Sequence, residues 1–296
     1  MVRGYDDRSS EQCMEFDVTE AGTLARYGVV GNPVEHSRSP EIHQAFAAQF
    51  GVRIQYDKFC VEEDAFAAFV RDFAAHDGSG LNVTVPFKGL AYELVAECDE
   101  LAEAAAAVNT IRVASNGALQ GYNTDGLGLV NDLISNGVVL EGATVLLAGA
   151  GGAARGVVLP LLRAGVAALT ITNRTRSRAD ALIASHAHLA PATRLTAADF
   201  AAVSQPVDIV INATSLGLQG QTVPLAEAVV HGSFCYDMSY GPAAVFARWA
   251  ASHGAATSVD GLGMLVEQAA QSFYIWRGER PQTAPVIAAL RAKLED

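Results

Sequence analysis

A glycine-rich turn in the middle of the chain limits its possible folds more than any other feature. The apolar, strand-like stretch 143–148 is followed directly by Gly149-Ala150-Gly151-Gly152-Ala153 and then by a helix-like stretch. In such a turn one glycine permits the tight bend, the next lets backbone approach a pyrophosphate, and a small residue lets the helix pack close to the strand. The free N–H groups and positive dipole of the helix start also favour phosphate. The spacing therefore predicts a dinucleotide-binding unit.

The residues after the next strand-like stretch, 169–172, indicate which dinucleotide binds. This stretch leads into Asn173-Arg174-Thr175-Arg176-Ser177-Arg178. An NAD-binding unit usually carries Asp or Glu here for the ribose hydroxyls. A carboxylate would repel a 2′-phosphate, whereas the guanidinium groups of Arg174 and Arg178 would bind it. We therefore expect an NADP(H) site. The competing interpretation is a tight turn followed by an unrelated basic surface loop.

Composition excludes several other classes of protein. A net charge of −12 gives the chain no general attraction for nucleic acid or for an acidic membrane surface. No stretch of about 18 residues is apolar enough to predict a membrane span. The four cysteines are far apart in the sequence and form no CxxC or Cys/His spacing. We expect reduced thiols in a cytoplasmic protein and no metal site.

The length of 296 residues suggests about two domains. Residues 1–24 are polar and acidic and are expected to be a disordered leader. From Arg26 onwards strand-like and helix-like stretches alternate, which favours an α/β fold. We expect a first α/β domain over 25–125, completed by 264–296, and a second over 126–263 that contains the glycine-rich turn. The second domain is predicted to be of the Rossmann type.

Individual elements follow from capping and periodicity. Ser39 is expected to be a helix N-cap with Pro40 at the first helical position. The alanine-rich, acidic stretch 90–107 is expected to form one helix. The last parts of the chain, 264–276 and 285–294, also have helical character and could pack back on the first domain.

Polar residues in the first half stand where strands and helices are expected to end. Ser37 and Ser39 lie at the mouth of a helix, where N–H groups and the dipole favour a carboxylate. Ordinary helix capping by Ser39 is the alternative. Period-two alternation places Asn82 and Thr84 on one face of a strand that Pro86 ends.

Three further groups could carry out or support chemistry. Lys88 follows the proline that ends the strand, Asp125 lies in a glycine-bracketed loop, and Asn109 supplies an amide. Alone, the lysine could be a solvated surface residue and the aspartate a turn residue. Together they suit recognition of a polyhydroxylated acid with proton transfer by Lys88 and Asp125.

These motifs also resemble the shikimate dehydrogenase family. The resemblance covers about residues 25–290 and keeps the order of the motifs along the chain. Several independent blocks in register are more specific than any single one. The blocks that carry the resemblance are residues 31–43, 82–88, 107–110, 122–126, 149–153, 173–175, 212–215, 237–240 and 261–268.

The resemblance implies NADPH-linked reduction of 3-dehydroshikimate to shikimate, a step of aromatic amino acid and chorismate biosynthesis, by a cytoplasmic monomer or homodimer. It implies that Lys88 and Asp125 are catalytic. It assigns Ser37, Ser39 and Tyr240 to the substrate carboxylate, and Asn82, Thr84, Asn109 and Gln268 to the hydroxyls or ring. Its implied NADP contacts are Gly149, Ala150, Gly151, Gly152, Ala153, Asn173, Arg174, Thr175, Arg178, Thr214, Met238 and Gly261.

Three alternatives remain at this level. One is a quinate/shikimate dehydrogenase that uses NAD, although Asn173-Arg174 and Ser39 depart from the residues expected of such a protein. Another, within the same class, is an amino-sugar-acid dehydrogenase of a secondary pathway. The third is a non-catalytic NADP-binding sensor, whose expected signature is loss of Lys88 or Asp125. Both residues are present.

Overall fold

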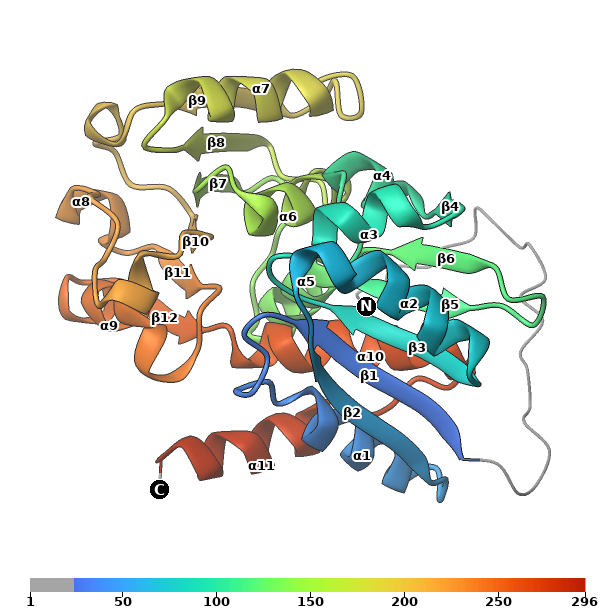
Figure 1. Cartoon of the computed structure of the whole chain (residues 1–296). Coiled ribbons are helices and arrows are strands. Elements are labelled where there is room, and N and C mark those ends of the chain that lie inside the picture. Colours follow the sequence, from blue (N-terminus) through green and yellow to red (C-terminus); the bar gives the residue numbers. More distant parts are fainter. Residues whose placement is uncertain (1–23, 296) are drawn as a thin grey trace.

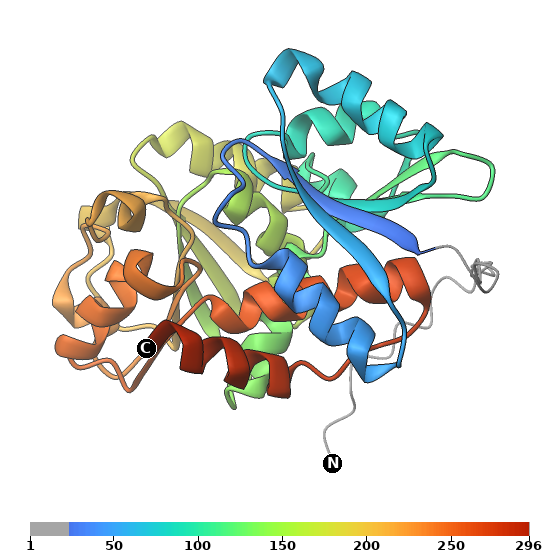
Figure 2. The same ribbon diagram turned by 60° about the horizontal axis from the view of Figure 1, so that its bottom comes forward.

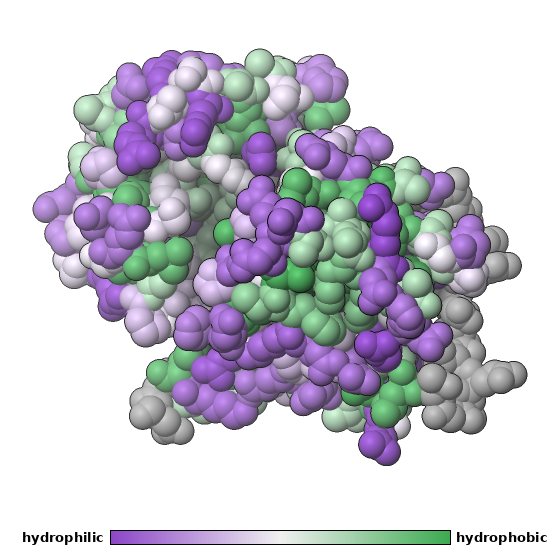
Figure 3. All heavy atoms as spheres, in the orientation of Figure 1, coloured by the Kyte–Doolittle hydropathy of each residue, from purple (hydrophilic) through white to green (hydrophobic). Residues whose placement is uncertain are grey.

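The computed structural model describes residues 24–295, so the predicted leader lies almost entirely outside the described part. Two lobes, each built on a six-stranded sheet, lie on either side of a hollow (Figures 1 and 3). The first sheet has the strand order β2-β1-β3-β5-β6-β4, and its β3–β5 and β5–β6 pairs are antiparallel. Its strands are β1 (Ala25–Gly31), β2 (Ile54–Cys60), β3 (Gly78–Val83), β4 (Glu97–Cys98), β5 (Thr110–Val113) and β6 (Leu119–Tyr122).

The second sheet is parallel throughout and has the order β12-β11-β10-β7-β8-β9. This is the doubly wound order, and its direction reverses between β7 and β10. The strands are β7 (Thr144–Ala148), β8 (Ala168–Thr172), β9 (Arg194–Ala198), β10 (Ile209–Asn212), β11 (Phe234–Asp237) and β12 (Thr257–Asp260). The helices between them are α6 (Gly152–Arg163), α7 (Arg176–His186), α8 (Glu227–Val230) and α9 (Val245–Ser252).

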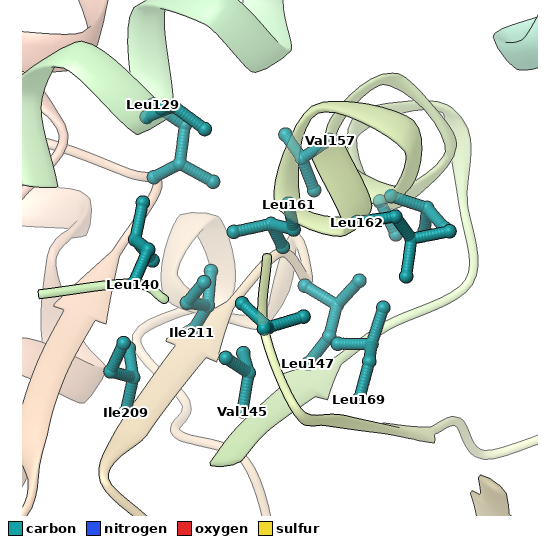
Figure 4. Close-up of a cluster of buried hydrophobic side chains, with 14 of the residues drawn as sticks. Leu129, Leu140, Val145, Leu147, Val157, Leu161, Leu162, Leu169, Ile209 and Ile211 are labelled. Carbon is teal, nitrogen blue, oxygen red and sulfur yellow. The ribbon is translucent and has the colours of Figure 1, made fainter. Parts of the chain in front are cut away.

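The central strands of this sheet are apolar on both faces because helices cover both. In β7, residues 145–148 are all buried. Val145 and Leu147 pack with Val157 and Leu161 of α6, as Figure 4 shows. This core holds the end of β7, and therefore the glycine-rich turn, in a fixed position.

Helices from both ends of the sequence complete the first lobe. Its earlier helices are α1 (Ser39–Gln49), α2 (Phe66–Ala75), α3 (Lys88–Leu94) and α4 (Glu100–Ala105). The C-terminal helices α10 (Leu262–Arg277) and α11 (Ala284–Glu295) return to pack on α1, as Figure 2 shows. Helix α5 (Asp125–Ser135) joins the two sheets and packs along α10. The two chain segments that connect the lobes are therefore neighbours.

Two local predictions are wrong. Helix α1 begins at Ser39 itself and Arg38 occupies the N-cap position, so Pro40 is the second helical residue. No side chain caps this helix, because the Ser39 hydroxyl accepts a hydrogen bond from Ser37 instead of bonding the helix backbone.

The stretch 90–107 forms two short helices rather than one. Between α3 and α4 the chain pairs with β6 as the short strand β4. Asp99 then starts α4, because its side chain accepts the N–H of Ala102. Pairing with a strand more than 20 residues later in the sequence overrides the local helical tendency.

Candidate active site

A cavity of about 340 Å³ is lined mostly by residues of the first lobe and also by Met238, Tyr240 and Gly261 of the second. Residues from six separate parts of the sequence line it. They include the two predicted catalytic residues and all seven predicted substrate contacts: Ser37, Ser39, Asn82, Thr84, Lys88, Asn109, Asp125, Tyr240 and Gln268. The fold thus brings the predicted residues together, and their individual roles remain predictions.

Lys88 and Asp125 form an ion pair within this cavity. Each is the first residue of a helix, α3 and α5 respectively. The Lys88 ammonium Nζ lies 2.6 Å from Asp125 Oδ2, and both side chains are mostly buried. The other carboxylate oxygen, Oδ1, accepts the amide N–H of Asn109 at 2.8 Å. The carboxylate is therefore held at both oxygens, and the ammonium is held toward the cavity beside it.

Asn109 was predicted to contact the substrate, but in the structure its side chain bonds Asp125 and the neighbouring Thr124. Its amide nitrogen also donates to Thr124 Oγ1 at 2.9 Å, and its oxygen accepts the backbone N–H of Thr124 at 2.9 Å. A side chain bonded at both ends keeps one orientation. The structure therefore places Asn109 as a support for Asp125, in addition to lining the cavity.

The other end of the cavity carries hydroxyls beside Arg38, whose guanidinium pairs with Glu41. The Ser37 hydroxyl donates to Ser39 Oγ at 3.1 Å, and it also accepts the backbone N–H of Ser39 at 3.2 Å. Tyr240 reaches the same cavity from the loop after β11, and burial raises the pKa of its hydroxyl, so that it stays protonated. Hydroxyl donors at a helix start can bind a carboxylate.

Close backbone packing places Thr84 at the cavity. Its N–H bonds to Val30 of the neighbouring strand. A Cβ on Gly31 would lie 2.4 Å from the Thr84 methyl carbon, so a side chain at Gly31 would displace Thr84. Close packing against Thr84 therefore explains why glycine occupies this strand end.

The glycine-rich turn has the geometry of a phosphate cradle. Gly149 has φ +117°, a conformation that favours glycine. Cβ atoms built on Gly151 or Gly152 meet nothing within 4 Å, so these residues face open space. Helix α6 begins at Gly152, and no side chain caps its first N–H groups. This turn lies at the β7–β10 reversal, where doubly wound sheets bind their ligands.

The three arginines of the predicted 2′-phosphate loop differ from one another in whether they form ion pairs. Arg176 contacts the carboxylates of Asp180 and Asp199. Arg174 and Arg178 are exposed and have no ion-pair partner within residues 24–295. Asn173 shapes the loop by donating to the Thr175 carbonyl at 2.9 Å. These residues fit NADP, since two exposed guanidinium groups follow β8, where dinucleotide-binding units of this kind contact the adenosine ribose.

The remaining predicted cofactor residues link the turn to the cavity. The Thr214 methyl lies against Gly149, and its hydroxyl donates to Asn212 Oδ1 at 2.7 Å. Met238 and Gly261 line the cavity itself. The groups suited to a nucleotide therefore extend from the exposed loop of Arg174 to the cavity wall.

Sequence reasoning missed a set of residues beneath the cavity. Tyr56, His43, Thr110 and Ser272 are buried and bond to the side chain of Asn82. His43 stands in a motif of the family resemblance and four residues after Ser39, which places both on one face of α1. This spacing could have indicated that His43 lies near the site.

The described part of the chain contains neither a metal-binding cluster nor a membrane-spanning helix. In residues 24–295 no three or more His, Cys, Asp or Glu side chains gather as a metal ion would require. None of the helices in that range is long and apolar enough to cross a membrane.

The doubly wound sheet, its open glycine-rich turn and the adjoining cavity with a lysine–aspartate pair define the class of a two-domain, dinucleotide-dependent oxidoreductase. Family models agree over most of the chain. Residues 29–111 match the shikimate dehydrogenase substrate binding domain, residues 132–221 match shikimate / quinate 5-dehydrogenase, and residues 261–291 match the shikimate 5'-dehydrogenase C-terminal domain. The chain belongs to the shikimate dehydrogenase family.

Individual relatives support this assignment. A protein of Alkalilimnicola ehrlichii named shikimate dehydrogenase (NADP(+)) is 52% identical over 269 residues, which cover 90% of this chain and 98% of that protein. The structure of an Ael1 enzyme from Pseudomonas putida has a TM-score of 0.85 and 40% identity, covering 90% of this chain and 98% of that one. A shikimate 5-dehydrogenase from Thermus thermophilus, solved with NADP(H) and shikimate, has a TM-score of 0.80 and 28% identity, covering 91% and 99%.

These comparisons confirm the expected two-domain α/β fold with a Rossmann-type domain, the NADP cofactor and the expected enzyme class. They also confirm the function predicted from the sequence, reversible reduction of 3-dehydroshikimate to shikimate in aromatic biosynthesis.

Proposed function

We propose that Lys88 and Asp125 carry out the proton transfer that accompanies reduction of the 3-dehydroshikimate ketone to shikimate. NADPH, when bound, supplies the hydride to the ketone carbon. Lys88 donates a proton to the forming alkoxide, and its positive charge stabilises the oxygen as negative charge develops. The observation that carries this proposal is the 2.6 Å Lys88–Asp125 pair inside the cavity.

Asp125 orients the lysine and can accept a hydrogen bond from a neighbouring substrate hydroxyl. Asn109 keeps its carboxylate from rotating, because it holds Oδ1 while Lys88 holds Oδ2. Ser37, Ser39 and Tyr240 bind the substrate carboxylate, while Asn82, Thr84 and Gln268 face its ring and hydroxyls. A cavity built to bond several hydroxyls discriminates against analogues that lack them, because its own groups would be left unpaired.

The cofactor occupies the second lobe in this proposal. The turn from Gly149 to Ala153 holds the pyrophosphate, and Arg174 with Arg178 holds the 2′-phosphate beside Asn173 and Thr175. Thr214, Met238 and Gly261 lie along the path toward the cavity. Residues 25–125 with 264–296 then form the substrate-binding catalytic domain, and 126–263 form the NADP-binding domain.

One assay tests the proposed function against its alternatives. Oxidation of shikimate and of quinate is followed at the NADPH absorbance band with NADP+ and, separately, with NAD+. We expect shikimate with NADP+ to give the highest kcat/KM. A preference for quinate with NAD+ would favour the quinate/shikimate alternative, and NADP+ binding without turnover of either acid would favour a sensor.

We propose in addition that the protein is a monomer or homodimer of the cytoplasm. The free thiols Cys60, Cys98 and Cys235 support a reducing, cytoplasmic location. Light scattering measures the oligomeric state, and fractionation of cells measures the location.

A further inference from the structure

A chain of hydroxyl groups runs beneath the cavity from its carboxylate end to its ring end. Ser37 donates to Ser39 at 3.1 Å, and the Ser39 side chain is near enough to the Tyr56 hydroxyl to favour its ionised form. The Tyr56 hydroxyl donates to Asn82 Oδ1 at 2.7 Å. Tyr56 thus bonds to one predicted contact of the substrate ring and lies beside one predicted contact of its carboxylate, although it does not itself line the cavity.

Asn82 is also held from its other sides. The His43 Nε2 lies 3.1 Å from Asn82 Oδ1, and burial lowers the pKa of His43 to about 3, so that the ring is neutral and donates through Nε2. The Asn82 amide nitrogen donates to Ser272 Oγ at 3.0 Å and to Thr110 Oγ1 at 3.2 Å. Donors surround its oxygen and acceptors surround its nitrogen, which selects one orientation of the amide.

The scaffold under these contacts is rigid. Tyr56 is 4% exposed, and its ring stacks on His43 with ring centroids 4.6 Å apart. Ser39 and His43 lie one turn apart on α1, while Tyr56 comes from β2. A tyrosine ring fixed in this way sets the separation between the two groups beside its hydroxyl.

We infer that Tyr56 is a positioning residue, which sets the spacing between the carboxylate-binding serines and Asn82 and so selects substrates with a carboxylate and ring oxygens at one separation. The inference rests on the proposed assignment of Ser39 and Asn82 to substrate binding. Without the tyrosine hydroxyl, Ser39 loses a neighbouring polar group and the oxygen of Asn82 loses one of two donors. Substrate binding must then order these side chains itself.

Tyr56→Phe tests this inference because it keeps the ring and removes the hydroxyl. The neighbouring strand offers a matched control, Tyr27→Phe. Tyr27 stands directly opposite Tyr56 in the β1–β2 pair, is 3% exposed, and stacks on Trp276. Its hydroxyl faces Arg277 and Ser79 instead of the cavity. If removing any buried tyrosine hydroxyl were enough to weaken shikimate binding, both variants would show the same rise in KM.

In Tyr56→Phe, shikimate must immobilise one or two side chains that are already fixed in the parent. This cost corresponds to a rise of about three- to tenfold in the KM for shikimate. The kcat and the KM for NADP+ of this variant should stay close to those of the parent. Tyr27→Phe should leave all three parameters unchanged. Equal behaviour of the two variants, or a parallel rise in both KM values of Tyr56→Phe, would overturn the inference.

A double-mutant cycle with Ser39→Ala shows whether Tyr56 acts through Ser39. In the Ser39→Ala background, Tyr56→Phe should raise the KM for shikimate less than it does in the parent. Full multiplication of the two effects would contradict the inference. Thermal unfolding verifies that each variant is folded. If Tyr56→Phe does not fold, 4-aminophenylalanine at position 56 takes its place. That residue keeps a donor for Asn82 but is a poorer acceptor for Ser39, so a KM for shikimate equal to that of the parent would overturn the inference.

These results are distinguishable from failure of the proposed function. If the parent chain does not oxidise shikimate with NADP+, the proposed function itself fails. If the parent is active and Tyr56→Phe behaves like Tyr27→Phe, only the role of Tyr56 is rejected.

Discussion

On the substrate side of the site the polar side chains bond one another, whereas on the nucleotide side the two arginines predicted to hold the 2′-phosphate are exposed. Asn82, Asn109 and Asp125 are buried, and each bonds to several protein groups. Arg174 and Arg178 are exposed and have no carboxylate partner in residues 24–295. We therefore expect substrate selectivity to come from a prearranged hydrogen-bond network, and NADP binding to depend on backbone groups and exposed charge.

The largest expected effect concerns the centre of the prearranged side. Lys88→Ala should lower kcat by about 10²- to 10⁴-fold, the usual contribution of a general acid, with a much smaller change in the KM for shikimate. Steady-state kinetics in both directions measures both parameters. Lys58→Ala, at an exposed lysine that bonds the Glu35 carbonyl, is the control. Near-normal turnover by Lys88→Ala would show that this pair is not the catalytic one.

A second prediction uses acid to weaken the buried network. Burial lowers the pKa of His43 to about 3, from an ordinary value of 6.5. The unfolded chain therefore binds this proton first, so the stability that neutral His43 provides is complete above about pH 6.5 and is lost as the pH falls towards 3. Between pH 7 and pH 5 this residue should lower the free energy of unfolding by about 2 kcal/mol.

His43→Gln isolates that contribution because glutamine keeps an N–H group and does not titrate. Urea unfolding at pH 7 and pH 5 gives the free energy of unfolding of both proteins. The difference between the two pH values should be smaller in the variant by about the same 2 kcal/mol. An identical pH dependence in both proteins would mean that the His43 pKa is not lowered in the folded state.

On the nucleotide side, Arg174→Ala should raise the KM for NADPH about tenfold, as expected for one charge-assisted hydrogen bond at an exposed site. The KM for 3-dehydroshikimate should stay nearly constant. Arg176→Ala is a matched control in the same loop, because Arg176 already contacts Asp180 and Asp199. Equal effects on both KM values, or equal effects of both variants, would argue against a 2′-phosphate contact.

The smallest expected effect is that of salt. Exposed charges are screened as ionic strength rises, whereas the neutral hydroxyls at the carboxylate end of the cavity are not. From about 0.05 M to 0.2 M KCl we expect the KM for NADPH to rise about threefold and the KM for shikimate to rise less. The same titration on Arg174→Ala should show a weaker dependence for NADPH. A stronger salt effect on shikimate would reverse the comparison.

Much of the fold could be predicted where periodicity and turn residues agree. The strand before the glycine-rich turn and the strand before Asn173 were placed within one residue of β7 and β8. The error at 90–107 has a tertiary cause, since β6 pairs with β4 in the middle of the predicted helix. The start of α1 was misplaced by one residue because Ser39 bonds Ser37 instead of capping the helix.

The candidate site was predicted residue by residue but not as an arrangement. The motif spacing and the family resemblance predicted Lys88, Asp125 and Asn109 as site residues, and all three line the cavity. The spacing and the resemblance did not indicate that Asn109 holds the Asp125 carboxylate, because an amide in a strand-end motif has several possible partners. Tyr56 carried no signal at all, since an isolated tyrosine in an alternating strand is an ordinary core residue.

The sequence by itself determined the α/β class, the dinucleotide turn and the basic loop that favours NADP over NAD, because each depends on residues that are near one another along the chain. Only the tertiary structure decided which polar groups meet. Asn82 and Ser272 are separated by 190 residues and yet share a hydrogen bond, because the C-terminal helices return to the first lobe. Long-range packing of this kind depends on how whole sheets and helices bury their apolar faces, which no local pattern specifies.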